Sequence, residues 1–327
     1  MSPLSLFDAT NTVPLGDVAS VATATNRILE QCFGKGSFDS KLLCSSFAFV
    51  GRMFAGEQPG YLACDMPYHD LRHSLDTTLV MGRLIAGYQS ERGGSSDALA
   101  PEHGLVGVLL ALLHDTGYLR TASEHALCGP QLMPRHESRG VEFAASHLRG
   151  TPLARHATLA TLICATRMGI DFDAFFAEHE GAAVTLGQML GSADLLSQMA
   201  DRCYLERCYY HLYPELVLAA ADRVRTPDGR QTILYRDALD LLGRTPQFYE
   251  TVVRKRLDHD FKGATRYLGV HFGGADPYVP AIRSNLERAQ RIVVENRLEL
   301  LGPEPPTTTR NLAAIYHGRP PRGPSAR

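Results

Sequence analysis

Two short stretches of the sequence hold histidines and aspartates at spacings that suit a metal ion. The first is PYHDLRHSLDTT, in which His69, His73 and Asp76 stand at positions i, i+4 and i+7. In a helix these three side chains share one face. The second is ALLHDTGY, where His114 and Asp115 follow an apolar run. Charged groups beside so many aliphatic side chains are costly unless their charge is compensated, and a divalent metal would compensate it.

These residue types suit the hydrolysis of a phosphate ester. That reaction needs positive charge at the phosphoryl oxygens and a hydroxide near neutral pH. A bound divalent metal supplies both, because it lowers the pKa of a bound water from roughly 16 to about 7. His73, His114, Asp115 and a further carboxylate meet the need for ligands. Such ligands accept Mg, Mn, Zn or Fe, so we expect one or two divalent ions without a choice among them.

The segments that must position these residues have the patterns of helices. Few runs of β-branched and aromatic residues alternate with period two, whereas many segments have helical apolar spacing. We therefore predict an all-α protein. We expect a flexible leader over residues 1–20, a catalytic domain over residues 21–275, a C-terminal helical extension over residues 276–316 and a disordered basic tail over residues 317–327.

The composition limits the class of protein. The 327 residues include 33 basic and 35 acidic side chains, and this near balance argues against nucleic acid as a partner. The seven cysteines are odd in number and lack CxxC spacing, which indicates reduced thiols. No apolar stretch is long enough for a membrane span, and the first residues do not look like a secretion signal, so we expect a cytoplasmic protein. The helix near Ile292 offers an apolar side for a homodimer.

Four segments together resemble a known family. PYHDLRHSLDTT resembles the YHNxxHAxDV segment of the class I 3′,5′-cyclic nucleotide phosphodiesterases, a branch of the HD-domain metal-dependent phosphohydrolases. ALLHDTGY resembles their HD motif, ICATRMGIDFDAF a segment written ATDMxxHF, and GSADLLSQMADR the segment with the last metal-binding Asp. The matches follow the family's order from Tyr68 to Arg202. The resemblance implies an HD-domain helical bundle that hydrolyses a phosphoester.

The resemblance also implies roles for individual residues. The first metal would be held by His73, His114, Asp115 and Asp194. Asp115 would also bridge to a second metal, and Asp201, one helical face away from Asp194, competes for the role of last ligand. His69 would be the general acid that protonates the leaving oxygen. Asp76 would orient the ring N–H of a nearby histidine.

The second metal has two candidate contacts. His136 begins HESRGVEFAASHL, which looks like the H-x-x-x-G helix of broader HD proteins, where that histidine touches the second metal. Glu137 instead matches the phosphodiesterase glutamate that binds the metal-bridging water. The chain departs from the phosphodiesterases at Tyr118, Asp70 and Arg167, where they have His, Asn and Asp. Without a histidine at position 118, occupancy of the second metal site depends on His136.

The expected substrate is a small-molecule phosphoester. The resemblance offers a cyclic nucleotide as one candidate, but cyclic nucleotide specificity does not carry over with the metal site. Arg167 is either an ion-pair partner or a phosphate-binding cation. Gln247, next to Phe248, is the candidate for the family's purine-clamping glutamine. Two other functions stay open. One is a di-iron oxygenase on the same fold, with which His136 as a ligand is compatible, and the other is a degenerate, non-catalytic protein that binds a nucleotide or a partner, motivated by the three departures from the family.

Overall fold

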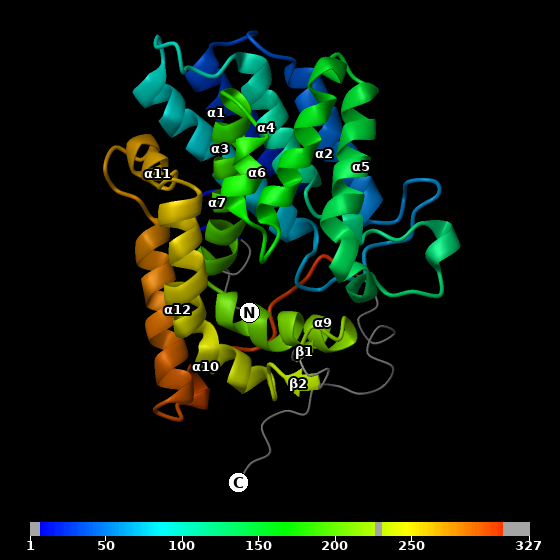
Figure 1. Ribbon diagram of the computed structural model, residues 1–327, viewed down its shortest axis with the longest axis vertical. Coiled ribbons are helices and arrows are strands. Elements are labelled where there is room, and N and C mark those ends of the chain that lie inside the picture. The colour runs from blue at the N-terminus through cyan, green and yellow to red at the C-terminus, as the bar shows by residue number, and fades with distance from the viewer. Residues whose placement is uncertain (1–6, 226–230, 310–327) are drawn as a thin grey trace.

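The computed structural model describes residues 7–225 and 231–309, and these are mostly helical (Figure 1). Their α helices are α1 (Val18–Phe33), α2 (Ser40–Phe54), α3 (Leu71–Arg92), α4 (Pro101–Leu113), α5 (His136–Arg149), α6 (Phe172–Ala177), α7 (Ala182–Ala200), α8 (Tyr204–Arg207), α9 (Tyr213–Leu218), α10 (Ala238–Phe248), α11 (Arg266–His271) and α12 (Tyr278–Val293). In the described residues one antiparallel pair of strands is found, β1 (Arg223–Arg225) with β2 (Gln231–Ile233). The structure confirms the prediction of an all-α protein.

Short 3-10 and π segments connect many of these helices. The 3-10 segments are Thr116–Tyr118, Ala122–Glu124, Gly129–Arg135, Ala154–Thr166 and Leu298–Leu300. The π segments are Cys208–Leu212, Tyr249–Val253 and Arg256–Asp260. The first π segment joins α8 to α9, so the chain from α8 to α9 is one continuous helical stretch that passes beside the metal-binding motifs.

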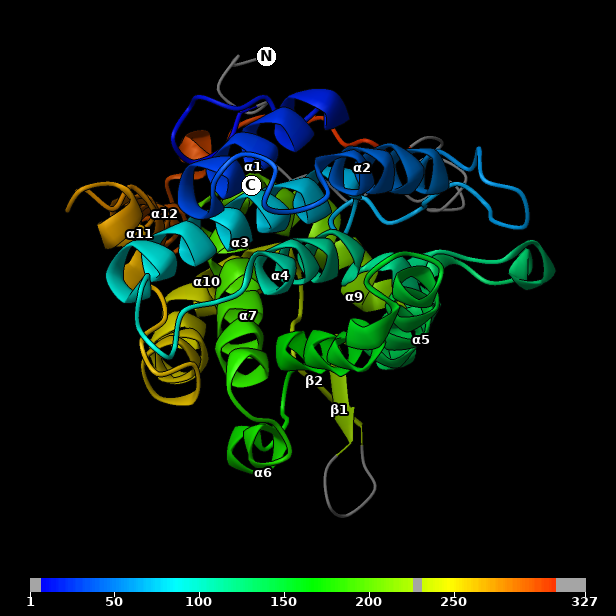
Figure 2. The ribbon, with the colours of Figure 1, turned by 90° about the horizontal axis from the view of Figure 1, so that it is seen from above.

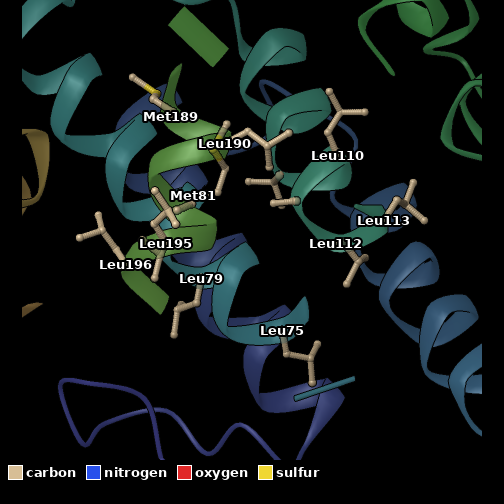
Figure 3. Close-up of a cluster of buried hydrophobic side chains, with 14 of the residues drawn as sticks. Leu75, Leu79, Met81, Leu110, Leu112, Leu113, Met189, Leu190, Leu195 and Leu196 are labelled. Carbon is tan, nitrogen blue, oxygen red and sulfur yellow. The ribbon is translucent and has the colours of Figure 1, made fainter. Parts of the chain in front are cut away.

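Helix α3 lies at the centre of the bundle and packs against α1, α4, α7 and α11 (Figure 2). Every residue from 71 to 88 is buried, so α3 has no solvated face over this length. A helix in that position belongs to the core of a domain. Figure 3 shows the leucine and methionine side chains that α3, α4 and α7 contribute, among them Leu79, Leu110 and Leu190. This core joins the three helices that carry or lead into His73, His114, Asp115 and Asp194.

The predicted flexible leader covers residues 1–20, and its described part is instead packed against the bundle. Asp8 is fully buried, and its Oδ2 lies 2.7 Å from Nη2 of Arg83 on α3. Leu15 is also fully buried, and Asp17 caps α1 by accepting hydrogen bonds from the backbone of its first turn. The polar composition of this segment reflects turns and a helix cap rather than a loose chain.

The segment predicted to be a C-terminal helical extension, residues 276–316, is packed in its described part against the rest of the helical bundle. Helix α12 lies beside α10 and α7 (Figures 1 and 2), and the Asn285 amide donates hydrogen bonds to the carbonyls of Met199 and Asp201 at 2.9 and 2.8 Å. Ile292, on the side expected to offer a homodimer interface, is buried within the chain. Residues 310–327, which include the predicted basic tail over 317–327, lie outside the described residues. Within the described ranges, none of the helices has the length and apolarity needed to cross a membrane.

Candidate metal centre

The start of α3 places the two histidines of the first motif differently from the prediction. Asp70 has extended backbone, and its side chain accepts a hydrogen bond from the backbone N–H of His73 at 3.2 Å. This contact is a helix cap, so α3 begins at Leu71 and holds His73 in its first turn. His69 therefore precedes the helix, and the expected spacing along one helix does not apply to it. Its ring is nonetheless near that of His73, with ring centroids 6.0 Å apart.

The four predicted ligands of the first metal converge in the interior from α3, the end of α4 and the middle of α7. Nε2 of His73 lies 3.3 Å from Nε2 of His114 and 3.4 Å from Oδ2 of Asp115. Nε2 of His114 lies 3.3 Å from the same Asp115 oxygen. Asp194 completes the set, since its Oδ1 lies 3.1 Å from His73 Nε2 and 3.7 Å from His114 Nε2.

These separations suit a common metal ion. Ligands held about 2.1 Å from a metal at angles of 90° to 109° lie roughly 3.0 to 3.4 Å apart. The Oδ2 atom of Asp115 is buried without a hydrogen-bond partner among the described residues, although two imidazole nitrogens approach it. The buried group of His73, His114 and Asp115 could therefore hold a metal ion, with the ligand atoms of all three within 4.8 Å of one another.

One ring nitrogen of His114 is fixed by the backbone. Its Nδ1 lies 2.8 Å from the carbonyl oxygen of Ala111, which can only accept, so Nδ1 carries a proton and Nε2 is the nitrogen that faces the site. Burial lowers the pKa of His114, but Asp115 and Asp194 outweigh burial and raise that pKa to about 9. The same negative charge that holds a proton here would hold a cation.

The predicted general acid His69 is paired with a carboxylate that the sequence did not reveal. Its Nδ1 lies 2.6 Å from Oε2 of Glu215, whose side chain is fully buried on α9. Oε1 of Glu215 accepts hydrogen bonds from the backbone N–H groups of Tyr68 and His69 at 2.6 and 3.3 Å. Burial lowers the pKa of His69, but Glu215 outweighs it and that pKa is raised. His69 therefore favours its protonated form, as a general acid must.

A stack of three rings connects His69 to the predicted contact of the second metal. Tyr118, which stands where the phosphodiesterases have histidine, lies between His69 and His136, with ring centroids 4.9 and 4.2 Å from theirs. His136 Nδ1 donates to the carbonyl of Met133 at 2.7 Å. Burial lowers the pKa of His136, which favours the neutral form that a ligand requires. Glu137 is buried beside it, with Oε2 3.4 Å from His136 Nδ1.

Asp76 and Asp201 form part of a separate buried network. Oδ2 of Asp201 pairs with Nη1 of Arg72 at 2.6 Å, so Asp201 is engaged outside the metal-binding group and Asp194 supplies the last carboxylate. The hydrogen bonds of the described residues include none from a histidine ring to Asp76, and its Oδ1 is buried without a partner. Burial raises the pKa of Asp76 to about 7. The contacts of Asp76 therefore do not include the expected hydrogen bond that would orient a histidine ring.

A cavity of about 600 Å³ opens beside the metal-binding group. The predicted site residues that line it are His69, Asp115, His136, Glu137, Arg167, Asp194 and Phe248. Arg167 also pairs with Glu137, with Nε 3.6 Å from Oε1, so it is an ion-pair partner and a cavity residue at once. Gln247 is exposed on α10 and does not line the cavity. Helical periodicity turns it away from the side that Phe248 presents.

Two residues of the site were missed in the sequence. Glu215 lies in YPELVL, where nothing local relates it to a histidine 146 positions away. Gln198 had a weak signal, because it follows Asp194 by one helical turn. Its amide donates to Asp194 Oδ1 at 2.6 Å and accepts from the hydroxyl of Tyr68 at 3.1 Å. It thereby fixes the orientation of the last ligand.

A scan of the sequence against models of protein families found no match, and a search of curated proteins found none.

Proposed function

We propose that this protein is an HD-domain phosphohydrolase that cleaves a phosphoester with one or two divalent metal ions. One observation carries the proposal: the ligand atoms of His73, His114, Asp115 and Asp194 converge beside the His69–Glu215 pair, and His69, Asp115 and Asp194 line a single cavity. The motifs that hold these residues are those that resemble the cyclic nucleotide phosphodiesterases. The reaction we propose is accordingly hydrolysis of a phosphodiester, and the resemblance to the cyclic nucleotide phosphodiesterases concerns the metal-binding residues rather than the substrate.

The metal-binding residues would hold the ion in the buried interior at the wall of the cavity. A divalent ion bound there would supply positive charge for the phosphoryl oxygens and a nucleophile from water. Asp115 and Asp194 have their carboxylates at the cavity wall, and the amide of Gln198 keeps Asp194 in place. Arg167, also at the wall, adds a cation near the site.

His69 would supply the proton. Hydrolysis breaks the bond between phosphorus and the leaving oxygen, and that oxygen takes a proton as it departs. The Nδ1 proton of His69 is held by Glu215, which leaves Nε2 as the nitrogen for the substrate. A positioned general acid contributes about 10²- to 10⁴-fold in rate. The carboxylate stabilises the protonated ring before transfer and orients it throughout.

The test is hydrolysis of bis-4-nitrophenyl phosphate and of cyclic AMP by the full chain with Mn²⁺ or Mg²⁺. We expect turnover that needs added metal. His73→Ala is expected to abolish both turnover and metal binding, whereas His69→Ala should lower kcat by about 10²- to 10⁴-fold with metal binding retained. The matched control is His125→Ala, since His125 is exposed and outside the site; this variant should match the parent protein.

Two results would contradict the proposal. Folded protein that binds metal yet hydrolyses neither ester with any divalent ion would favour the degenerate, non-catalytic alternative. Two irons per chain in protein purified without oxygen, together with oxygen consumption, would favour the di-iron oxygenase. Metal analysis and the two hydrolysis assays therefore separate the three functions.

A further inference from the structure

The cavity beside the metal-binding group has a large apolar part. More than half of the residues that line it are aliphatic or aromatic. Those contributed by α7, α9, α10 and the π segment before α9 are Leu195, Met199, Leu212, Leu216, Leu241 and Phe248. Its volume of about 600 Å³ is that of a site for a whole small molecule rather than for a phosphate group alone. The cavity therefore has room for a substituent next to the reacting phosphate.

The apolar wall continues directly from the catalytic residues. On α7, Leu195 follows the ligand Asp194, and Met199 follows Gln198. On α9, Leu216 follows Glu215, the partner of His69. An ester whose phosphate lies at the metal-binding group would thus place its substituent against these aliphatic side chains.

Three polar side chains of α7 and α10 that line the cavity have partners within the protein. Gln198 is the amide side chain among the described lining residues. Its oxygen accepts a hydrogen bond from the Tyr68 hydroxyl, and its nitrogen donates one to Asp194. The hydroxyl of Thr245 donates to a main-chain carbonyl of its own helix at 3.2 Å. Arg244 pairs with Asp240 at 3.2 Å. Against the aliphatic side chains of α7, α9 and α10 a purine or a sugar would find few hydrogen-bonding groups, so burying its own polar groups there is unfavourable.

We propose that the cavity selects a phosphoester that carries a hydrocarbon group, alkyl or aryl, in place of a nucleoside. The hydrocarbon lies against the wall formed by α7, α9 and α10, and the phosphate lies at the metal-binding group. This inference rests on the proposed function and names its substrate class. The driving force is transfer of apolar surface from water into the cavity.

The first experiment is a series of 4-nitrophenyl phosphodiesters whose second substituent is methyl, butyl, octyl or thymidine. All release the same 4-nitrophenolate, so the chemical step is held constant. We expect kcat/KM to rise about threefold to fourfold for each methylene between methyl and butyl. The octyl ester should exceed the thymidine ester. A kcat/KM that is the same within twofold across the alkyl esters, or that is highest for thymidine, would overturn the inference while leaving phosphodiester hydrolysis in place.

A pair of variants tests the wall itself. Phe248→Gln puts a polar group into the cavity and should lower the octyl-to-methyl ratio of kcat/KM about tenfold. The control is Glu250→Gln, which also introduces a glutamine but at an exposed position outside the cavity. It should leave the octyl-to-methyl ratio of kcat/KM unchanged. Equal ratios in the two variants would count against the inference.

Binding separates this inference from the proposed function. Calorimetry with methylphosphonate and octylphosphonate needs no turnover, so it reports on the cavity even if no ester is hydrolysed. We expect octylphosphonate to bind the parent protein at least tenfold tighter than methylphosphonate, and Phe248→Gln to reduce the difference. Equal binding of the two phosphonates would overturn the inference, and absence of hydrolysis with the expected difference in binding would overturn only the proposed function.

Discussion

At the scale of single residues, the orientation of the His69 ring depends on a carboxylate that accepts from its Nδ1. Glu215 accepts from Nδ1 of that ring and from two backbone N–H groups, while its own side chain has no exposure to solvent. The hydrogen bond and negative charge of this carboxylate favour the protonated form of the imidazole. The ring of Tyr118 also stacks on the His69 ring, with the two ring centroids 4.9 Å apart. Position and protonation of His69 are thus both determined by its neighbours.

Glu215→Gln should reduce activity and change its pH dependence. Glu215 raises the pKa of His69 against the opposing effect of burial, so His69 keeps its proton to higher pH than an ordinary histidine. Without the negative charge the pKa falls, and the alkaline limb of the kcat profile should move to lower pH, with kcat reduced about tenfold to hundredfold. The measurement is kcat from pH 5 to 9 with saturating metal and substrate. An unshifted alkaline limb would show that His69 is not the group that titrates; Glu250→Gln, at an exposed position, is the control.

At the scale of elements, α3 is held in place by charged contacts as well as by its leucines. Arg83 lies in the buried second half of α3 and donates both to Asp8 in the N-terminal segment and to the hydroxyl of Tyr278 at the start of α12. One guanidinium therefore ties two ends of the described chain to the helix that carries His73. Oδ1 of Asp8 also accepts from the backbone N–H groups of Thr12 and Val13, which shapes the segment before α1.

Asp8→Asn should destabilise the protein by about 3 to 5 kcal/mol at pH 7, because it leaves the buried charge of Arg83 without its partner. Burial raises the pKa of Asp8, but Arg83 and the hydrogen bonds outweigh burial and the pKa is lower than usual. The contribution of the ionised carboxylate is therefore fully present above the unfolded pKa of about 4 and is lost as pH falls through the lower folded value. Urea unfolding from pH 3 to 7 measures it.

The control for this prediction is Asp17→Asn. Asp17 caps α1 at an exposed position, and asparagine is about as good a cap as aspartate, so this change should cost little. If the two variants unfold at the same urea concentration, the Asp8–Arg83 pair does not stabilise the N-terminal segment in the way described.

At the scale of the whole molecule, the metal-binding group joins three helices of the core. His73 comes from α3, His114 and Asp115 from the end of α4, and Asp194 from α7. An ion bound to all of them stabilises the folded state because the unfolded chain does not gather these ligands. The ligands also bring negative charge into a buried place, and a cation would relieve their repulsion.

Addition of Mn²⁺ should therefore raise the melting temperature. A ligand present at 100 times its Kd stabilises the folded state by about 2.7 kcal/mol, which corresponds to roughly 4 °C for a chain of this size. Differential scanning fluorimetry with and without Mn²⁺, followed by excess EDTA, measures the shift and its reversal. Asp194→Ala should remove most of the shift, while His125→Ala should keep it. A parent protein whose melting temperature ignores every divalent ion would contradict a metal site in the core.

The sequence by itself determined the features that depend on local pattern. Helical spacing of apolar residues predicted the all-α class, since that periodicity is written along each segment. The motifs around His73, His114, Asp115 and Asp194 predicted the residues whose ligand atoms converge. These residues could be identified because each lies in a short sequence motif that is recognisable without knowledge of the fold.

Only the tertiary structure decided the contacts between distant segments. The pairing of Glu215 with His69 and the engagement of Asp201 by Arg72 join residues more than a hundred positions apart, and no local period encodes such partners. The cap at Asp70 moved His69 out of α3, because a side chain that bonds the first turn competes with continuation of the helix. The apolar cavity wall likewise exists only where α7, α9 and α10 meet. The residues of the candidate metal site could thus be identified from the sequence, whereas the partner of His69 and the shape of the cavity depend on how the helices pack.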